Sequence, residues 1–260
     1  MIVKHYGLIL VGMLCIILFN GCGNSDDFAE MMKKGEKSAV NGRWDEALDY
    51  GKRALVCQPN SAEALLHTAL AYENNGLYNE ALEEVKKASA IAPENFFVQY
   101  TLGKMYFDRG RYDSSVAPLK TALKLRPYDM NTVILLADVS VKLKNSQDAL
   151  RYYSILAKHG SYRENPKVWS ELGRIMLEQN KLKASYSYFS WAYSLQKKNP
   201  NADIVLNMAV LCDKYPMVKS KAQLYKAYAK RYYQEYLRMT QGNSSLARER
   251  AAVEARIKAI

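Results

Sequence analysis

The sequence repeats itself at an interval of 34 residues. Three prolines keep this interval: Pro59, Pro93 and Pro127. Small residues keep it as well, and those that recur are Gly42, Gly76, Gly110, Ala54, Ala88 and Ala122. Proline ends helices, whereas small residues let two helices approach closely. Because a unit of this size cannot bury its apolar face alone, the period predicts a stack of similar helical units that share a continuous core.

The residue types within each unit resemble the tetratricopeptide repeat, a helix–turn–helix unit of this period. The third unit carries the resemblance best, through Leu102, Gly103, Tyr106 and Pro127, and the first is weaker because Lys34 stands where leucine is expected. The repeats are expected over 28–61, 62–95, 96–129, 130–163 and 166–199, with a degenerate sixth over 202–238. The resemblance implies an all-α, right-handed superhelical solenoid of about five to six helix-turn-helix repeats over residues 28–240.

Residues 220–238 form a segment that is longer than the second helix of a standard repeat. Its apolar residues recur at spacings of three and four: Ala222, Tyr225, Ala229, Tyr232 and Tyr236. This spacing is typical of one apolar stripe along a helix, and we expect a C-terminal capping helix over the last repeat. A tyrosine-rich docking helix is the alternative. Residues 241–260 are expected to be a short amphipathic tail, which would be marginal as an isolated helix.

The amino terminus has the pattern of a signal peptide. Lys4 precedes an apolar run from Leu8 to Phe19, which is twelve residues long and therefore short for a spanning helix. The run ends at Gly21-Cys22, and a small residue directly before cysteine resembles the lipobox of bacterial lipoproteins. That resemblance implies that residues 1–21 are removed, that Cys22 carries acyl chains such as palmitate, and that 22–27 form a tether. An uncleaved membrane helix is the alternative.

The residues after Cys22 bear on the compartment. Gly23 stands where the lipoprotein family's inner-membrane retention signal has aspartate, so the resemblance implies an outer-membrane location. Ser25-Asp26-Asp27 resembles the surface-export signal of lipoproteins in one Gram-negative lineage. The cell surface is therefore favoured over the periplasmic face. The alternative is that the two aspartates only begin a helix, where carboxylates favour the positive end of the helix dipole.

The remaining reactive residues do not form a pattern typical of an enzyme or of a metal site. Cys57 and Cys212 are separated by about ten stacked helices, too far for a disulfide, so we expect both to be free and buried. His67 and His159 share no spacing with each other or with a cysteine pair, so neither a metal site nor a cofactor is expected. The sequence also lacks a phosphate-binding loop and a nucleophile elbow. We therefore expect no catalytic activity.

The net charge of +11 is unevenly distributed along the chain. Residues 23–100 hold 8 Lys and Arg against 13 Asp and Glu, a net charge of −5. Residues 101–260 hold 28 against 13, a net charge of +15. An exported protein does not routinely meet nucleic acid, so the basic half favours an anionic envelope component or an acidic protein partner. Ordinary solubilising residues are the alternative.

In tetratricopeptide-repeat proteins the concave groove is lined mainly by the second, fifth, ninth and twelfth residues of each first helix. Carried over to this sequence, the resemblance implies a partner-binding groove that includes Leu66, Leu70, Phe97, Tyr100, Lys104, Phe107, Ile134, Asp138 and Arg174. Aromatic side chains on one exposed stripe usually mark an interface. Lys104 would orient an acidic partner. The alternative is that the aromatic side chains are partly buried against the next repeat.

These observations predict a protein that works by binding. The leading hypothesis is a non-enzymatic scaffold or assembly factor, anchored by lipid to the bacterial outer membrane. Its architecture is similar to that of the pilotins of type IV pili and of the tetratricopeptide-repeat lipoprotein of the β-barrel assembly machinery. The alternative is a surface-exposed binding module for a glycan or peptide ligand.

Overall fold

The computed structural model describes residues 25–196, 199–215 and 219–260, and within these ranges the chain forms helices and turns but no strand. The chain divides into two compact units, residues 1–132 and 133–260. The predicted signal peptide over 1–21 and the predicted lipidation at Cys22 lie outside the described residues. None of the helices within the described ranges combines the length and the apolar character that a bilayer-spanning helix requires.

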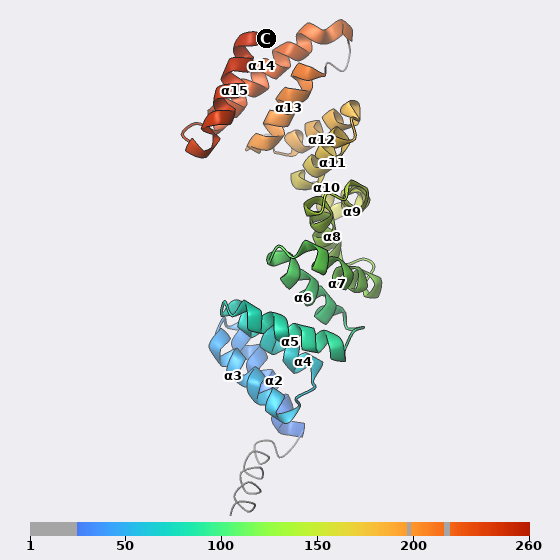
Figure 1. Cartoon of the computed structure of the whole chain (residues 1–260), viewed down its shortest axis with the longest axis vertical. Coiled ribbons are helices and arrows are strands. Elements are labelled where there is room, and N and C mark those ends of the chain that lie inside the picture. The colour runs from blue at the N-terminus through green and yellow to red at the C-terminus, as the bar shows by residue number, and fades with distance from the viewer. Residues whose placement is uncertain (1–24, 197–198, 216–218) are drawn as a thin grey trace, which may run out of the picture. The chain divides into compact units, whose positions relative to one another are not determined.

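The first unit is a series of helical hairpins (Figure 1). Its helices are α2 (Ser25–Val40), α3 (Trp44–Cys57), α4 (Ala62–Asn74), α5 (Tyr78–Ile91), α6 (Phe96–Asp108) and α7 (Tyr112–Leu125). Helix α2 packs on α3, α4 on α5, and α6 on α7, so each hairpin is one predicted repeat. Helix α2 begins at Ser25, three residues before the predicted start of the first repeat.

The second unit continues the same pattern after the boundary, which falls within α8 (Met130–Lys142). Its other helices are α9 (Ser146–Lys158), the short α10 (Gly160–Arg163), α11 (Pro166–Glu178), α12 (Leu182–Leu195), α13 (Ala202–Lys214), α14 (Ala222–Met239) and α15 (Ala247–Ala259). Helix α10 is an extra turn between two repeats, which explains why the fifth repeat resumes two residues late. The described helices confirm the predicted helical-repeat solenoid.

The periodic glycines have a backbone reason. Gly42, Gly76 and Gly110 adopt φ angles of 71°, 75° and 68° at the turn between the two helices of a repeat. Glycine is the default residue there because it alone enters this region without a steric cost. In the next two repeats Lys144 and Asn180 adopt the same turn, with φ angles of 56° and 57°. The turn geometry therefore persists in the repeats where the glycine pattern stops.

The periodic small residues lie where two helices pack closely. Ala54, Ala88 and Ala122 are fully buried. Gly103 in α6 packs directly against Leu119 in α7, so closely that an added Cβ atom would lie 2.5 Å from Leu119 Cγ. Real Cβ atoms do not approach carbon this closely. A larger side chain at Gly103 would therefore force the two helices apart.

Helix α14 is the predicted capping helix. Its residues Ala229, Tyr233 and Tyr236 are buried against Val205 and Cys212 of α13. Helix α14 has an apolar stripe, but its most buried residues are not all the predicted ones. Tyr233 is buried, whereas the predicted Tyr225 and Tyr232 are only partly buried.

The carboxy-terminal tail also joins this core, through Val253 of α15. Residues 241–260 are therefore packed on the solenoid, and contacts with α13 and α14 supply the stability that so short a helix lacks alone.

The two cysteines differ in a way that the sequence does not predict. Cys212 is a buried free thiol, as expected. Cys57 is only partly buried, so the prediction of a buried thiol is wrong at this position. It is the last residue of α3, at the rim of the hairpin rather than between helices.

Candidate functional site

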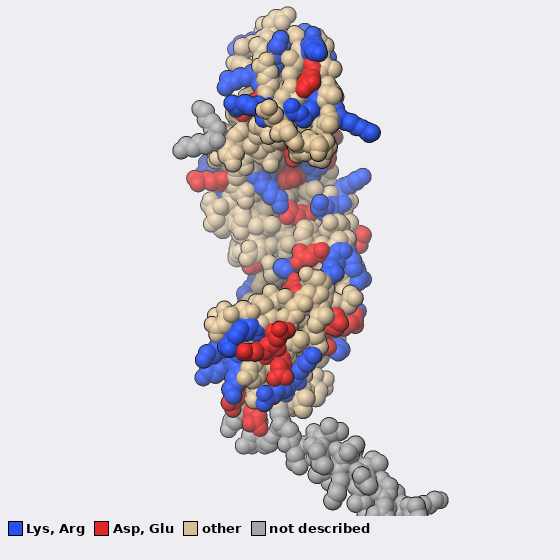
Figure 2. Space-filling view, turned by 90° about the vertical axis from the view of Figure 1, so that its left-hand side faces the viewer, with Lys and Arg blue, Asp and Glu red and all other residues tan. Residues whose placement is uncertain are grey.

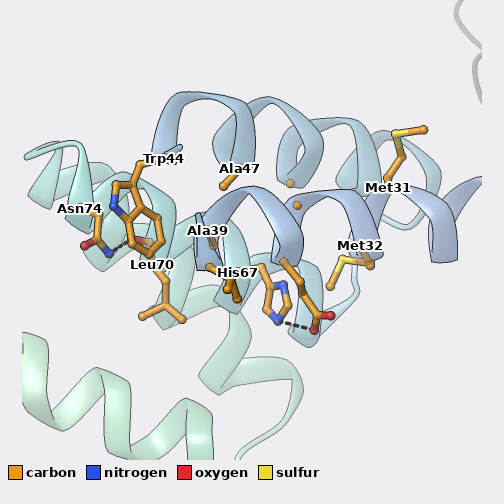
Figure 3. A pocket seen from close by; sticks show the side chains of 12 residues that line it. Met31, Met32, Ala39, Trp44, Ala47, His67, Leu70 and Asn74 are labelled. Carbon is orange, nitrogen blue, oxygen red and sulfur yellow. Dashed lines mark hydrogen bonds and ion pairs between the residues drawn. The ribbon is translucent and has the colours of Figure 1, made fainter. Parts of the chain in front are cut away.

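A cavity of about 380 Å³ opens in the first unit between α2, α3 and α4 (Figure 3). Its wall is mainly apolar, and the larger apolar side chains in it include Met31, Met32, Val40, Trp44 and Leu70. Figure 3 shows Trp44 and Asn74 at one end, the two methionines at the other, and His67 between them. We call this cavity the anchor pocket.

Small residues of α2 and α3 form part of the wall of the anchor pocket. Gly35 and Ala39 of α2 and Ala47 and Gly51 of α3 all line it. Gly51 is tightly packed, because an added Cβ atom would lie 2.5 Å from Thr68 Oγ1. Val40, which also lines the pocket, is 87% exposed. The pocket therefore extends from buried residues such as Met32 and Ala47 to the exposed side chain of Val40.

A small acidic cluster lies at the mouth of the anchor pocket. Glu36 of α2 lines the pocket, and its Oε1 atom lies 3.9 Å from His67 Nε2 on α4. Glu63, one turn before His67, completes a group whose ligand atoms all lie within 4.8 Å of one another. Within the part of the chain that the structure describes, no Lys or Arg lies within salt-bridge distance of Glu36 or Glu63. We call these two carboxylates the acidic rim.

The same cluster offers the ligand types that a divalent transition metal accepts, namely two carboxylates and one imidazole. Both carboxylates are exposed, however, and exposed acidic groups commonly lie this close without an ion. The cluster by itself therefore does not define a metal centre. The expectation that the chain has no metal site stays a prediction.

The predicted aromatic residues of α6 separate into two places. Phe97 is 53% exposed, and the guanidinium carbon of Arg126 lies 4.4 Å from the centre of its ring. Phe107 is partly buried and packs against Tyr112 with ring centres 5.6 Å apart. Ten residues of helix separate them, or about 15 Å. Tyr100 is partly buried and stacks on Phe96. The aromatic side chains do not form one bare stripe.

Lys104 already has two carboxylate partners in the first unit. Its Nζ atom lies 3.1 Å from Glu73 Oε1 and 2.7 Å from Asp108 Oδ2. Burial alone would lower the pKa of the Lys104 ammonium, but its hydrogen bonds to Asp108 and Glu73 outweigh burial and raise the pKa. An acidic partner would have to compete with both carboxylates. The role of Lys104 in orienting an acidic partner stays a prediction.

The predicted groove residues of the second unit also form contacts within that unit. Asp138 accepts hydrogen bonds from Tyr153 Oη at 2.5 Å and from Lys167 Nζ at 2.8 Å. Burial and this bond raise the pKa of Tyr153. Arg174 pairs with Glu171 at 2.9 Å and also with Glu178. Ile134 is partly buried. These side chains are held by contacts inside their own unit.

Sequence reasoning identified part of the anchor pocket. Leu70 is a predicted groove residue that lines it. Leu66 is partly buried and instead packs into the core between repeats. Met31, Val40, Trp44 and His67 were missed. The weak match of the first repeat does not identify them, because its departure from the pattern, Lys34, does not line the pocket.

Comparisons with known proteins agree with this architecture. Two family models described as tetratricopeptide repeat match the chain, at residues 50–83 and 69–130. A comparison with curated protein sequences gives no match. The fold and the repeat geometry define a helical-repeat solenoid protein. Over the matched residues 50–130, its units are tetratricopeptide repeats.

Solved structures with the same fold include PilF of Pseudomonas aeruginosa, which is 20% identical, with a TM-score of 0.63 over 89% of this chain and 100% of that chain. MamA of Desulfovibrio magneticus RS-1 is 19% identical, with a TM-score of 0.60 over 68% of this chain and 99% of that one. YrrB, described as a TPR protein with an unusual peptide-binding site, is 16% identical, with a TM-score of 0.61 over 76% and 96%. At these identities the likeness shows the fold.

Proposed function

We propose that the chain is a non-enzymatic scaffold or assembly factor that holds a protein partner in the anchor pocket. The observation that carries this proposal is the open, mainly apolar cavity of about 380 Å³ between α2, α3 and α4. A cavity of this size and lining suits a buried side chain of a partner. Interfaces concentrate their binding energy in a few such anchors. Leu70 and Trp44 would form the main contacts.

A pull-down from detergent-solubilised envelopes tests this site. Leu70→Glu places a charge in the apolar wall, and capture of the partner should be lost. Leu77→Glu is the matched control, because Leu77 is an exposed leucine of the same unit outside the pocket. Equal capture by both variants would contradict the proposal. Capture that is lost in Tyr100→Ala and Phe107→Ala but kept in Leu70→Glu would move the site to α6.

The proposed scaffold is attached to the bacterial outer membrane by lipid on Cys22. The support is the twelve-residue apolar run that ends at Gly21-Cys22, together with Gly23 after it. Two long acyl chains, at about 0.8 kcal/mol per CH₂, anchor a protein almost permanently. Asp26 and Asp27 favour the cell surface over the periplasmic face.

Intact-mass analysis of membrane fractions tests the anchor. The mature chain should begin at Cys22 and carry the mass of its acyl chains, and Cys22→Ala should abolish both processing and lipid mass. Cys15→Ala is the matched control, because Cys15 lies inside the apolar run and should be removed with it. A wild-type chain that retains residues 1–21 would contradict the lipid anchor.

A glycan-binding module at the cell surface is the second candidate function. It is favoured by an aromatic cluster in the second unit, where Trp169 lies 5.9 Å from Tyr188 and 6.1 Å from Trp191 between ring centres. Trp191 is 46% exposed, so one ring is open to a ligand. Binding of envelope polysaccharide should then fall in Trp191→Ala but not in Tyr215→Ala, an exposed aromatic outside the cluster. Equal binding of polysaccharide by the two variants would contradict a glycan-binding site at this aromatic cluster.

The basic second unit supports a weaker contact with an anionic envelope component. Figure 2 shows more basic than acidic side chains over its carboxy-terminal helices. On α14, Lys226, Lys230 and Arg231 are exposed and have no carboxylate within salt-bridge distance among the described residues. Binding at this surface should fall steeply with salt, whereas binding at an apolar pocket should respond weakly. Capture that survives Leu70→Glu but vanishes in high salt would assign the partner to the basic surface.

A further inference from the structure

We infer that the segment bound in the anchor pocket carries a Lys or Arg within four residues of its apolar anchor side chain. The inference rests on the proposed function, because it specifies the chemistry of the partner at the same site. It is opposite in sign to the acidic partner that the sequence predicts from Lys104.

The geometry of α2 places one carboxylate in the middle of the apolar wall. Residues four apart lie on the same face of a helix, about 5.4 Å from each other along its axis. Met32 and Val40 are the residues four before and four after Glu36, and all three line the anchor pocket. A side chain that enters the pocket therefore brings its neighbours in sequence close to Glu36.

Helix α4 adds a second carboxylate on the facing side. Glu63 and His67 are four residues apart, and Leu70 follows three residues later, so the three share one face of the helix. His67 and Leu70 line the anchor pocket, and Glu63 lies beside them with its oxygen within 4.8 Å of Glu36 and His67 atoms. Two carboxylates this close repel each other, and a cation between them relieves the repulsion.

The charges around the anchor pocket are not balanced inside the unit. Several other acidic residues of this unit pair with a basic side chain: Glu30 with Lys34, Glu83 with Lys86, and Glu84 with Lys87. No residue that lines the anchor pocket is a Lys or Arg. Among the described residues, the only basic side chain within ion-pair distance of the acidic rim is His67, which is charged only when it is protonated. A partner that is complementary to these carboxylates and to the unfilled apolar surface is therefore apolar and basic.

The test is selection from a random dodecapeptide library displayed on phage, with the full chain held in detergent. EDTA is present throughout, so that a metal ion bound by Glu36, Glu63 and His67 cannot mediate binding. Enriched sequences are expected to carry a Lys or Arg within four positions of a Leu, Met or aromatic residue. Enriched peptides are then synthesised with a fluorophore, and their affinity is measured by fluorescence polarisation at low and high salt.

The double variant Glu36→Gln/Glu63→Gln should weaken peptide binding at low salt by about three- to tenfold, and the difference should shrink at high salt. Glu94→Gln is the matched control, because Glu94 is an exposed carboxylate of the same unit that does not line the pocket. It should bind the peptides as the wild type does.

The outcomes separate the inference from the proposed function. Peptides that lose binding in Leu70→Glu but show no basic preference, or bind the double variant unchanged, would overturn the inference and leave the pocket in place. Enriched acidic peptides would overturn it as well. Peptides that bind Leu70→Glu as well as the wild type, or no enrichment at all, would overturn both.

Discussion

Arg256 of α15 donates hydrogen bonds to both carboxylate oxygens of Asp213 in α13, at 2.6 and 2.7 Å. Tyr233 of α14 donates a third hydrogen bond to the same carboxylate at 3.3 Å. The Asp213 side chain is 0% exposed, so its negative charge depends on these donors. Three helices of the second unit therefore meet at one buried carboxylate, and the last helix of the chain supplies its counter-charge.

Removing that counter-charge should loosen the second unit. Arg256→Leu leaves a buried carboxylate with only one tyrosine donor, and breaking one side of a buried ion pair is destabilising. The midpoint of thermal unfolding, followed by circular dichroism, should fall. Arg248→Leu is the matched control, because Arg248 is an exposed arginine of the same helix that does not pair with Asp213, and it should unfold like the wild type. Equal midpoints for the two variants would show that α15 does not stabilise the unit.

The same ion pair predicts a loss of stability in acid. The hydrogen bond from Arg256 holds the pKa of Asp213 below its ordinary value of 3.8. A group with a lowered pKa in the folded state contributes stability that is fully present above the unfolded pKa and is lost as the pH falls through the folded pKa. Urea unfolding of wild type and Asp213→Asn should therefore differ most near neutral pH and converge as the pH falls below the ordinary pKa of aspartate. A difference that is independent of pH would contradict the ionised pair.

The close packing of α6 on α7 predicts that even the smallest substitution of Gly103, to alanine, destabilises the folded protein. Gly103→Ala would place a Cβ atom 2.5 Å from Leu119 Cγ and 3.2 Å from its backbone nitrogen. We expect the free energy of unfolding to fall by about 1–3 kcal/mol, which is typical of overpacking. Gly160→Ala is the matched control, because its added Cβ atom would meet nothing within 4 Å. Similar unfolding of both variants would contradict the predicted register of the repeats.

The thiol of Cys212 should react slowly with alkylating reagents in the folded protein. Burial raises the pKa of its thiol to about 11, so little thiolate is present near neutral pH. Alkylation by iodoacetamide at pH 8, mapped to the Cys212 peptide by mass spectrometry, should be slow in buffer and fast in denaturant. Rapid alkylation without denaturant would mean that the core between α13 and α14 opens readily.

The repeat pattern could be predicted from sequence because it reflects backbone requirements that recur in every unit. Gly42, Gly76 and Gly110 occupy the same positive-φ turn, and the buried alanines occupy the same helix contact. The anchor pocket could not be predicted in the same way, because it is formed by side chains of three helices whose spacing does not recur in the other repeats. The ion pair of Lys104 could not be predicted from the sequence either. Its partner Glu73 is 31 residues away in the sequence, and their pairing depends on side-chain conformation.

The most direct test of the proposed binding site is site-specific photo-crosslinking in the native envelope. A benzoylphenylalanine placed at Val40, which lines the anchor pocket and is 87% exposed, should form a discrete adduct with the bound partner. The same photoreactive residue at Val56, which is 63% exposed on α3 and does not line the pocket, should form none. A partner held in the anchor pocket predicts an adduct at Val40 that disappears when Leu70→Glu is added. An adduct at Val56 of equal yield, or one at Val40 that persists in Leu70→Glu, would contradict it.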